Sequence, residues 1–368
     1  MSSGTPRVFG LDVMRALAIT LVVVVHSDYM LAVYWPGFPW IPFVDGVDLF
    51  FVLSGYLVGG ILLRYATTGA PSPKRLLDFW QRRWLRTLPN YYLFLLLNIV
   101  LLYFGLTRGV FNASIVYYFA FLQNLYKPVE TFFWESWSLV IEEWFYLLFP
   151  ILLFGLMRLF RLVARHAFLI AALVFILIPT AMRFLTAPGI ERLFDSELLI
   201  RKLVIYRMDT IGFGVLAAWV HHFMPSLWKS VRWPAFVLGA VGTIAVGQLY
   251  GSDHLWFSMT WFFTCGAIAM MLLLPELSAW KQIPAWGAPV VFMSRVSYAL
   301  YLVHMPVRDL FERFYAGASL PTAIALFVGY WATSITIAWL VYTGYERYFM
   351  SLRDRLGARL GSAVSPSS

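Results

Sequence analysis

The feature that most constrains the fold is a series of apolar runs that recurs along almost the whole 368-residue chain. About 20 predominantly apolar residues are enough for one helix to cross the hydrocarbon core of a bilayer. The first run extends from Ala16 to about Val33 and follows Arg7 and Arg15. Nine further runs, several shorter than the ideal, lie near Val47–Leu63, Tyr91–Leu106, Leu139–Met157, Ala167–Met182, Leu203–Val220, Ala235–Tyr250, Leu255–Leu274, Val290–Val307 and Pro321–Tyr342. These runs predict an all-α, polytopic integral membrane helix bundle of about ten transmembrane helices.

The composition agrees with lipid as the main solvent. Hydrophobic residues make up 61% of the chain and charged residues only 13%, too few to cover the surface of a soluble protein of this size. The single cysteine, Cys265, excludes an intramolecular disulfide. The formal charge of +9 comes from Lys and Arg at the ends of apolar runs, a pattern typical of membrane-surface anchors, so we expect no nucleic-acid partner.

The basic residues also predict an orientation. No small-residue cleavage site follows the first run, so we interpret it as a retained anchor. Ser114–Leu125 is short and contains Gln123 and Asn124, so we expect it to be re-entrant or interfacial. Ten spans then place about 18 of the 28 Lys and Arg on one side, which the positive-inside rule makes cytoplasmic together with both termini. Residues 1–346 form the predicted membrane domain, and 347–368 form a basic, then Ser-rich, cytoplasmic tail.

Two ionisable residues of the first run stand out. A charged side chain near the centre of a membrane helix costs at least about 2.5–3.5 kcal/mol, so each one needs a partner or a purpose. Arg15 and His26 lie about 16 Å apart along a helix, which puts His26 near the midplane if Arg15 is at the inner boundary. His26 is then either a reactive imidazole or a histidine hydrogen-bonded within the bundle.

The next apolar run and the basic segment after it suggest contacts and a ligand. In Asp45–Tyr56, the small pair Ser54 and Gly55 favours close helix packing or close approach of a ligand, and Asp48 is expected to be a partner or a helix cap. Arg83 and Arg86, three residues apart, share a helix face and are able to clamp a phosphate. The alternative for this basic cluster is binding to anionic lipid headgroups.

A polar stripe enters the fourth run. Ser138, Glu142 and Tyr146 share one helix face, and Glu143 points about 100° away. A carboxylate on that stripe is able to orient a histidine. The alternative is that one of the two glutamates pairs with an arginine such as Arg207. A second histidine, His304, follows late in the chain, and its partner is not deducible.

Together these segments resemble the membrane acyltransferase-3 family. The matching motifs, in the order of the family and over residues 9–345, are Arg15-x10-His26, GVDLFFVLSGYL at 46–57, RRWLR at 82–86, SWSLVIEEWFYLLFP at 136–150, the segment from Arg207, and SYALYLVH at 297–304. The resemblance implies a ten-span fold that transfers an acyl group, usually acetyl, from acyl-CoA to a hydroxyl of an envelope or secreted carbohydrate or glycolipid. Some relatives add an extracytoplasmic hydrolase-like domain, which this sequence does not contain.

The resemblance also assigns roles to residues. We expect His26 to be the general base, with Arg15 and Glu142 completing the catalytic set. The residues expected to bind substrate are Arg83, Arg86, Ser54, Trp137, Ser138, Glu143, Tyr146, Arg207 and His304. Glu143 stands where relatives often have Gln. We expect acyl-CoA (acetyl-CoA) as co-substrate, no metal and a bacterial inner (plasma) membrane location; the oligomeric state is not fixed.

A transporter is the competing interpretation, because intramembrane Arg, His and Glu also build proton and substrate pathways. A proton-coupled transporter or glycolipid flippase of this kind usually shows repeats with broken helices in matching positions of its two halves. The sequence shows no such repeat.

Overall fold

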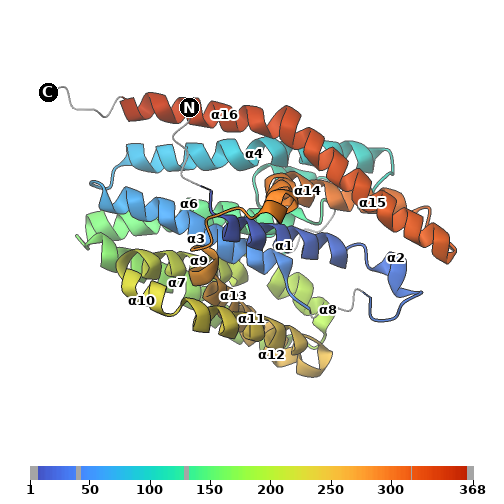
Figure 1. Cartoon of the computed structure of the whole chain (residues 1–368), viewed down its shortest axis with the longest axis horizontal. Coiled ribbons are helices and arrows are strands. Elements are labelled where there is room, and N and C mark those ends of the chain that lie inside the picture. The colour runs from blue at the N-terminus through green and yellow to red at the C-terminus, as the bar shows by residue number, and fades with distance from the viewer. Residues whose placement is uncertain (1–6, 39–42, 128–131, 316, 363–368) are drawn as a thin grey trace.

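The computed structural model describes residues 7–38, 43–127, 132–315 and 317–362, with side chains up to residue 355. All regular structure in these ranges is helical, and most long helices run along the longest axis of the bundle (Figure 1). The first half of the chain forms α1 (Phe9–Val25), α2 (Tyr29–Ala32), α3 (Gly46–Thr67), α4 (Pro73–Tyr103), α5 (Ile115–Phe119), α6 (Ser136–Leu159), α7 (Ala164–Thr186) and η1 (Ala187–Gly189). The second half forms α8 (Leu193–Ser196), η2 (Glu197–Arg201), α9 (Val204–Phe223), α10 (Pro225–Ser230), α11 (Arg232–Gln248), η3 (Ser252–His254), α12 (Leu255–Met259), α13 (Trp261–Leu277), η4 (Ala285–Gly287), α14 (Ala288–Glu312), α15 (Leu320–Val341), η5 (Tyr342–Glu346) and α16 (Arg347–Ser362).

Each of the ten predicted apolar runs overlaps a helix, but fewer than ten of these helices are long enough to count as spans. Six are long and apolar enough to cross a membrane, and the number rises to eight if each of two bent helix pairs forms one span. The expected count of ten is not reached because helices such as α1 and α13 contain only 17 residues. The chain is therefore an all-helical, multi-pass membrane protein with six to eight candidate spans among its described residues.

The segment Ser114–Leu125 does not form a span. Its only helix, α5, is five residues long. The polar side chains that follow turn inward: the Gln123 amide donates to Ser136 Oγ at 3.2 Å, and the Asn124 amide donates to the Trp137 carbonyl at 3.0 Å. A short helix anchored by buried amides agrees with the expectation that this stretch is not a transmembrane helix.

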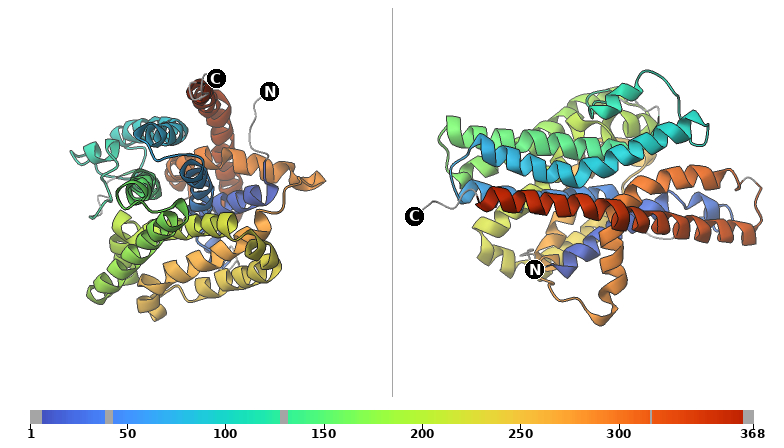
Figure 2. Two further views of the ribbon diagram at one scale, coloured as in Figure 1. Left: turned by 90° about the vertical axis from the view of Figure 1, so that its left-hand side faces the viewer. Right: turned by 90° about the horizontal axis from the view of Figure 1, so that it is seen from above.

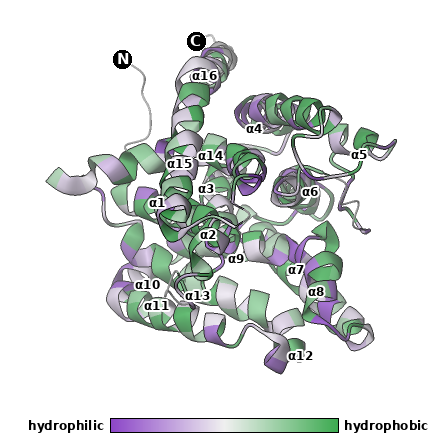
Figure 3. Cartoon of the chain, turned by 90° about the vertical axis from the view of Figure 1, so that its right-hand side faces the viewer, coloured by the Kyte–Doolittle hydropathy of each residue, from purple (hydrophilic) through white to green (hydrophobic). Residues whose placement is uncertain are grey.

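Basic connections gather at one end of the bundle. The α3–α4 and α6–α7 connections and the end of α16 lie together, at the left of Figure 1, and the second view in Figure 2 agrees. We call this the basic end, after Arg64, Lys74, Arg75, Arg158, Arg161 and Arg165. Helices α2, α8 and α12 lie toward the opposite end (Figure 1). Seen along the bundle from that end, hydrophobic residues predominate on most helices (Figure 3), and exposed side chains such as Leu177, Val241 and Val328 leave an apolar exterior suited to lipid.

Helices α3 and α9 meet through glycines. A Cβ atom on Gly55 would lie 2.0 Å from the Ile211 carbonyl oxygen, and one on Gly214 would lie 2.1 Å from the Val52 carbonyl oxygen. Both distances are far below van der Waals contact, so only glycine permits this approach. Close helix packing, one of the two interpretations of Ser54-Gly55, is thereby confirmed for Gly55.

We expect Gly55→Ala to destabilise the bundle more than Gly60→Ala does. The added methyl group at position 55 forces α3 and α9 apart, and overpacking of this kind typically costs about 1–3 kcal/mol. Gly60 lies on the same helix, and a Cβ atom there would have no heavy atom of a neighbouring segment within 4 Å, so it is the matched control. Thermal unfolding in mild detergent measures the difference, and equal midpoints for the two variants would contradict the packing argument.

Charged residues are buried in pairs between α3, α7 and α9. Arg207 pairs with Asp48, and both side chains are at most 1% exposed. Arg183 and Asp209 are fully buried and 2.6 Å apart. The Asp45 carboxylate accepts hydrogen bonds from the Val47 and Asp48 amides at the start of α3.

These contacts correct one interpretation of the sequence. Arg207 pairs with Asp48 rather than with Glu142 or Glu143, because α9 packs closely on α3 and turns the arginine toward it. Asp48 is thus a partner, as expected, and Asp45 is the cap.

Candidate active site

A cavity of about 920 Å³ extends into the bundle from the basic end. Its mouth includes Arg64 at the end of α3 and His221 and His222 at the end of α9. Polar residues from six helices line it: Asp12, Arg15, Ser54, Arg83, Arg86, Thr87, Ser138, Glu142, Tyr146, Ser297, Tyr298 and Arg353. We call it the large cavity.

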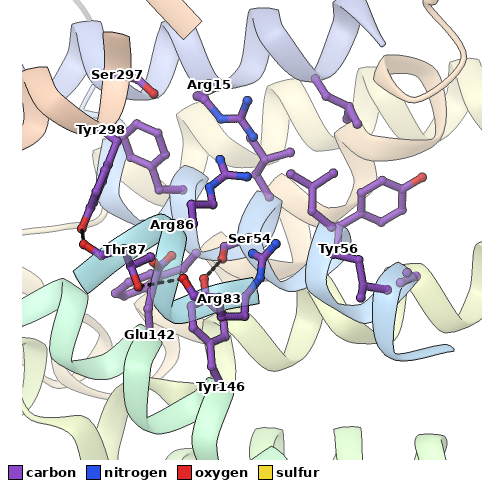
Figure 4. A pocket seen from close by; sticks show the side chains of 18 of the residues that line it. Arg15, Ser54, Tyr56, Arg83, Arg86, Thr87, Glu142, Tyr146, Ser297 and Tyr298 are labelled. Atoms are coloured by element: carbon purple, nitrogen blue, oxygen red, sulfur yellow. Dashed lines mark hydrogen bonds between the residues drawn. The ribbon is translucent and has the colours of Figure 1, made fainter. Parts of the chain in front are cut away.

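Three guanidinium groups dominate the large cavity. Figure 4 shows Arg15, Arg86 and Arg83 one above another along it, with Ser54, Glu142 and Tyr146 beside Arg83. The Arg15 side chain donates to Ser294 Oγ at 3.4 Å and lies 3.9 Å from Asp12. The Arg83 guanidinium lies 5.9 Å from the centre of the Tyr146 ring. Three convergent guanidiniums suit a ligand that carries phosphate groups.

The two adjacent glutamates of α6, Glu142 and Glu143, contact different parts of the bundle. Glu142 faces the large cavity next to Tyr146, whose hydroxyl is hydrogen-bonded to that of Ser54. Glu143 turns away and accepts a hydrogen bond from Thr87 Oγ1 at 2.6 Å. The different directions of the two carboxylates follow from their adjacent positions on one helix, as the sequence predicted.

A second cavity of about 380 Å³, the small cavity, lies toward the opposite end and contains both predicted histidines. His26 follows the last residue of α1, and His304 lies on α14. Their ring centres are 5.0 Å apart in an edge-to-face arrangement. The other lining residues are Val22, Val47, Arg108, Trp134, Glu135, Trp137, Glu197, Arg201, Lys202, Tyr301, Met305, Arg308 and Asp309.

The hydrogen bonds of the two imidazoles fix their tautomers. His26 Nδ1 lies 2.7 Å from the Val22 carbonyl oxygen, and His304 Nδ1 lies 2.6 Å from the Tyr301 carbonyl oxygen. A carbonyl oxygen only accepts hydrogen bonds, so each Nδ1 carries the proton and a neutral ring keeps its lone pair on Nε2. Each histidine is therefore arranged to accept a proton or a hydrogen bond at Nε2.

A thin partition separates the two cavities. Val47 and Tyr301 line both of them. The Tyr301 hydroxyl donates to the Glu135 carbonyl at 2.9 Å and lies 2.7 Å from Ser138 Oγ. Arg15 on α1 lines the large cavity, and His26, directly after α1, lines the small one.

The structure therefore brings the predicted site residues together in two groups. Arg15, Ser54, Arg83, Arg86, Ser138, Glu142 and Tyr146 line the large cavity, and His26, Trp137 and His304 line the small one. Arg207 and Glu143 are not among the lining residues of either cavity.

One expected contact differs. Glu142 does not orient the His26 ring, because it faces the large cavity while the Val22 carbonyl holds His26. Sequence reasoning also missed Glu135 and Tyr301. Glu135 directly precedes the predicted α6 stripe, and Tyr301 is three residues before His304, so spacing on a helix was the available signal.

Comparisons with known proteins agree with these features. The sequence model of the Acyl_transf_3 family, described as an acyltransferase domain, matches residues 8–343. O-acetyltransferase OatA of Staphylococcus aureus strain NCTC 8325 is 24% identical over 345 residues, with 86% of this chain and 53% of the relative covered. A protein of S. aureus strain COL, provisionally named an O-acetyltransferase, is 25% identical over 351 residues with the same coverage. The chain thus spans about half the length of these relatives, and no solved structure matches it.

Proposed function

The chain belongs to the Acyl_transf_3 family of acyltransferases, and from this premise we propose that it is a membrane O-acyltransferase. The acyl group, most simply acetyl, passes from acyl-CoA bound at the basic end to a carbohydrate or glycolipid hydroxyl bound at the opposite end. The relatives named as O-acetyltransferases support the type of transfer. By the positive-inside rule the basic end is the cytoplasmic side, with ten crossings and both termini inside. The bacterial relatives favour a plasma-membrane location.

The donor fits the large cavity. Acyl-CoA carries several phosphate charges, and Arg83 and Arg86 offer guanidinium groups that make no hydrogen bond to another residue of the described ranges. Arg15, Glu142 and the hydroxyls of Ser54 and Tyr146 line the same cavity (Figure 4). The phosphates then bind near the mouth, and the thioester points toward Tyr301 and Val47.

The acceptor fits the small cavity, where His26 acts as the general base. Neutral His26 takes the hydroxyl proton at Nε2 as the acceptor oxygen attacks the thioester carbonyl carbon. The carbon–sulfur bond breaks, and the proton passes from His26 to the leaving thiolate, giving the ester and free CoA. An acyl-His26 intermediate uses the same Nε2 lone pair as a nucleophile, so both routes depend on the observed tautomer.

The observation that carries the proposal is the meeting of two cavities from opposite ends at Val47 and Tyr301, with both histidines on one side of the partition. Displacement of these two side chains would bring a thioester to His26. A transporter also needs access from both ends, and thiol release separates the two functions. Purified protein incubated with labelled acetyl-CoA and a polyol should release free CoA, whereas movement of a glycolipid without thiol release would favour the flippase.

We expect Arg83→Gln and Arg86→Gln each to raise the KM for acetyl-CoA by about tenfold and to leave the acceptor KM unchanged. A hydrogen bond to a charged group contributes about 1.5–3 kcal/mol, and each variant removes one guanidinium from the phosphates. Initial rates of thiol release against acetyl-CoA concentration measure the effect. Arg192→Gln is the control, because Arg192 is an exposed residue that pairs with Asp195. An unchanged donor KM in both cavity variants would exclude this phosphate site.

A further inference from the structure

The small cavity contains a buried carboxylate without a partner. Both carboxylate oxygens of Glu135 are inaccessible to solvent and make no hydrogen bond to a described residue, and the residue is only 5% exposed. This carboxyl group lies one residue before α6 begins. An unsatisfied buried polar group costs folding free energy, so a ligand that satisfies it is the simplest reason to keep it.

A second acceptor in the same cavity lacks a donor. His304 Nε2 is buried and has no hydrogen-bond partner among the described residues, and its Nδ1 proton is already donated to the Tyr301 carbonyl. The backbone carbonyl of Glu135 accepts a hydrogen bond from the Tyr301 hydroxyl. Tyr301 therefore holds the main chain of Glu135 in place. Glu135 and His304 thus present unsatisfied acceptor atoms to a cavity that also holds His26.

The remaining charges of the small cavity favour a neutral ligand. Arg201 is held by Asp45 at 2.6 Å and by Glu197 at 2.8 Å, and Arg108 pairs with Glu312. These cations are already neutralised by protein carboxylates, so they do not call for an anion. Four basic residues line the cavity with three acidic ones, so a cation is not favoured either. The buried atoms of this cavity without a partner among the described residues are the acceptors of Glu135 and His304 and the donors Arg201 Nε and Arg308 Nε. A hydroxyl group both donates and accepts, so it suits both kinds.

The indole rings add a flat apolar surface. Trp134 and Trp137 line the cavity, and Arg201 lies 6.0 Å from the Trp137 ring centre. Ligand sites typically combine aromatic walls with a few polar groups that set orientation. A ring with an apolar face and several hydroxyls matches both features.

We propose that the small cavity binds a neutral sugar unit, and that Glu135 and His304 accept hydrogen bonds from two of its hydroxyls and thereby present a third to His26. This inference rests on the proposed function, since it names the acceptor class and two residues that position it. Glu135 acts as a positioning residue and takes no part in the proton transfer.

The test compares two acceptors of similar ring size. Methyl glucopyranoside carries several hydroxyls, and cyclohexylmethanol carries one. With acetyl-CoA saturating, we expect Glu135→Gln to raise the KM for methyl glucopyranoside by at least about tenfold, because an amide replaces one accepting oxygen with a donor. The KM for cyclohexylmethanol and that for acetyl-CoA should stay within about twofold. Glu276→Gln, at a surface ion pair with Arg232, is the matched control.

Binding and stability readouts keep the inference independent of activity. Saturation-transfer NMR should detect methyl glucopyranoside on the wild type and a much weaker signal on Glu135→Gln, whether or not thiol is released. The unfolding midpoint of Glu135→Gln should equal or exceed that of the wild type, because the substitution removes an unpartnered carboxylate.

The outcomes distinguish failure of the Glu135 role from failure of the acyltransferase function. Equal effects of Glu135→Gln on both acceptors, no effect on either, or unchanged sugar binding would overturn the role of Glu135. Absence of thiol release by the wild type with either acceptor would overturn the acyltransferase function, while the NMR comparison would still decide whether the cavity binds sugar.

Discussion

Replacing His26 by alanine should lower acyl transfer by about 10²–10⁴-fold, the range that a positioned general acid–base contributes. His26 is held in the Nδ1-protonated form by the Val22 carbonyl and lies in the small cavity, so its Nε2 lone pair is free to take the hydroxyl proton there. His304 is adjacent, but it faces the cavity from another helix and is assigned to acceptor binding. The rate of free CoA release at saturating acetyl-CoA and acceptor measures the loss.

His254→Ala is the control for this experiment, because His254 is an exposed residue of η3. His26→Ala should still insert into membranes and bind acetyl-CoA with the affinity of the wild type, since the donor residues belong to the other cavity. Near-normal transfer by His26→Ala would remove the general-base role and the acyl-histidine alternative together.

The second large effect is on stability. Arg207→Ala should lower the free energy of unfolding by about 3–5 kcal/mol, because it leaves the Asp48 carboxylate buried without its partner. The Arg207 guanidinium also lies 3.7 Å from the centre of the Phe263 ring, so α13 loses a contact as well. Unfolding in mild detergent with increasing denaturant measures the change.

A double substitution distinguishes the pair from its parts. Asp48→Leu combined with Arg207→Met removes both charges, and replacing a buried ion pair by apolar residues of similar volume is often neutral for stability. The double variant should therefore be more stable than Arg207→Ala. Arg192→Ala, which breaks an exposed ion pair with Asp195, should leave the free energy of unfolding almost unchanged. If the double variant is as unstable as Arg207→Ala, the loss of stability comes from packing and not from the unpaired Asp48 carboxylate.

Local patterns in the sequence predicted most of the helices. Apolar runs locate the helices because an unsatisfied backbone in lipid is too costly for other structures. The spacing of Arg83 and Arg86 predicted a shared face, and both line one cavity. The resemblance to the acyltransferase-3 family is confirmed by the match over residues 8–343. His26 as the base and Arg15 and Glu142 as its companions stay predictions.

Contacts between helices were less predictable, because they depend on how each helix is rotated and how closely it packs. The pairing of Arg207 with Asp48 follows from the glycine contact between α3 and α9, which no single helix reveals. Glu142 was expected at His26, yet its helix turns it into the other cavity. The count of ten crossings is not confirmed, because several apolar runs fold into helices of only 17 residues.

The partition formed by Val47 and Tyr301 also matters for the membrane potential of the cell. A continuous aqueous channel lined by guanidiniums would let ions leak and would collapse the electrochemical gradient across the membrane. With Val47 and Tyr301 lying between the two cavities, the proposed transfer would move an acyl group across the barrier while water and ions stay on their own sides. Substitution of Tyr301 by a much smaller residue would therefore harm a living cell through loss of its membrane potential, quite apart from any loss of product.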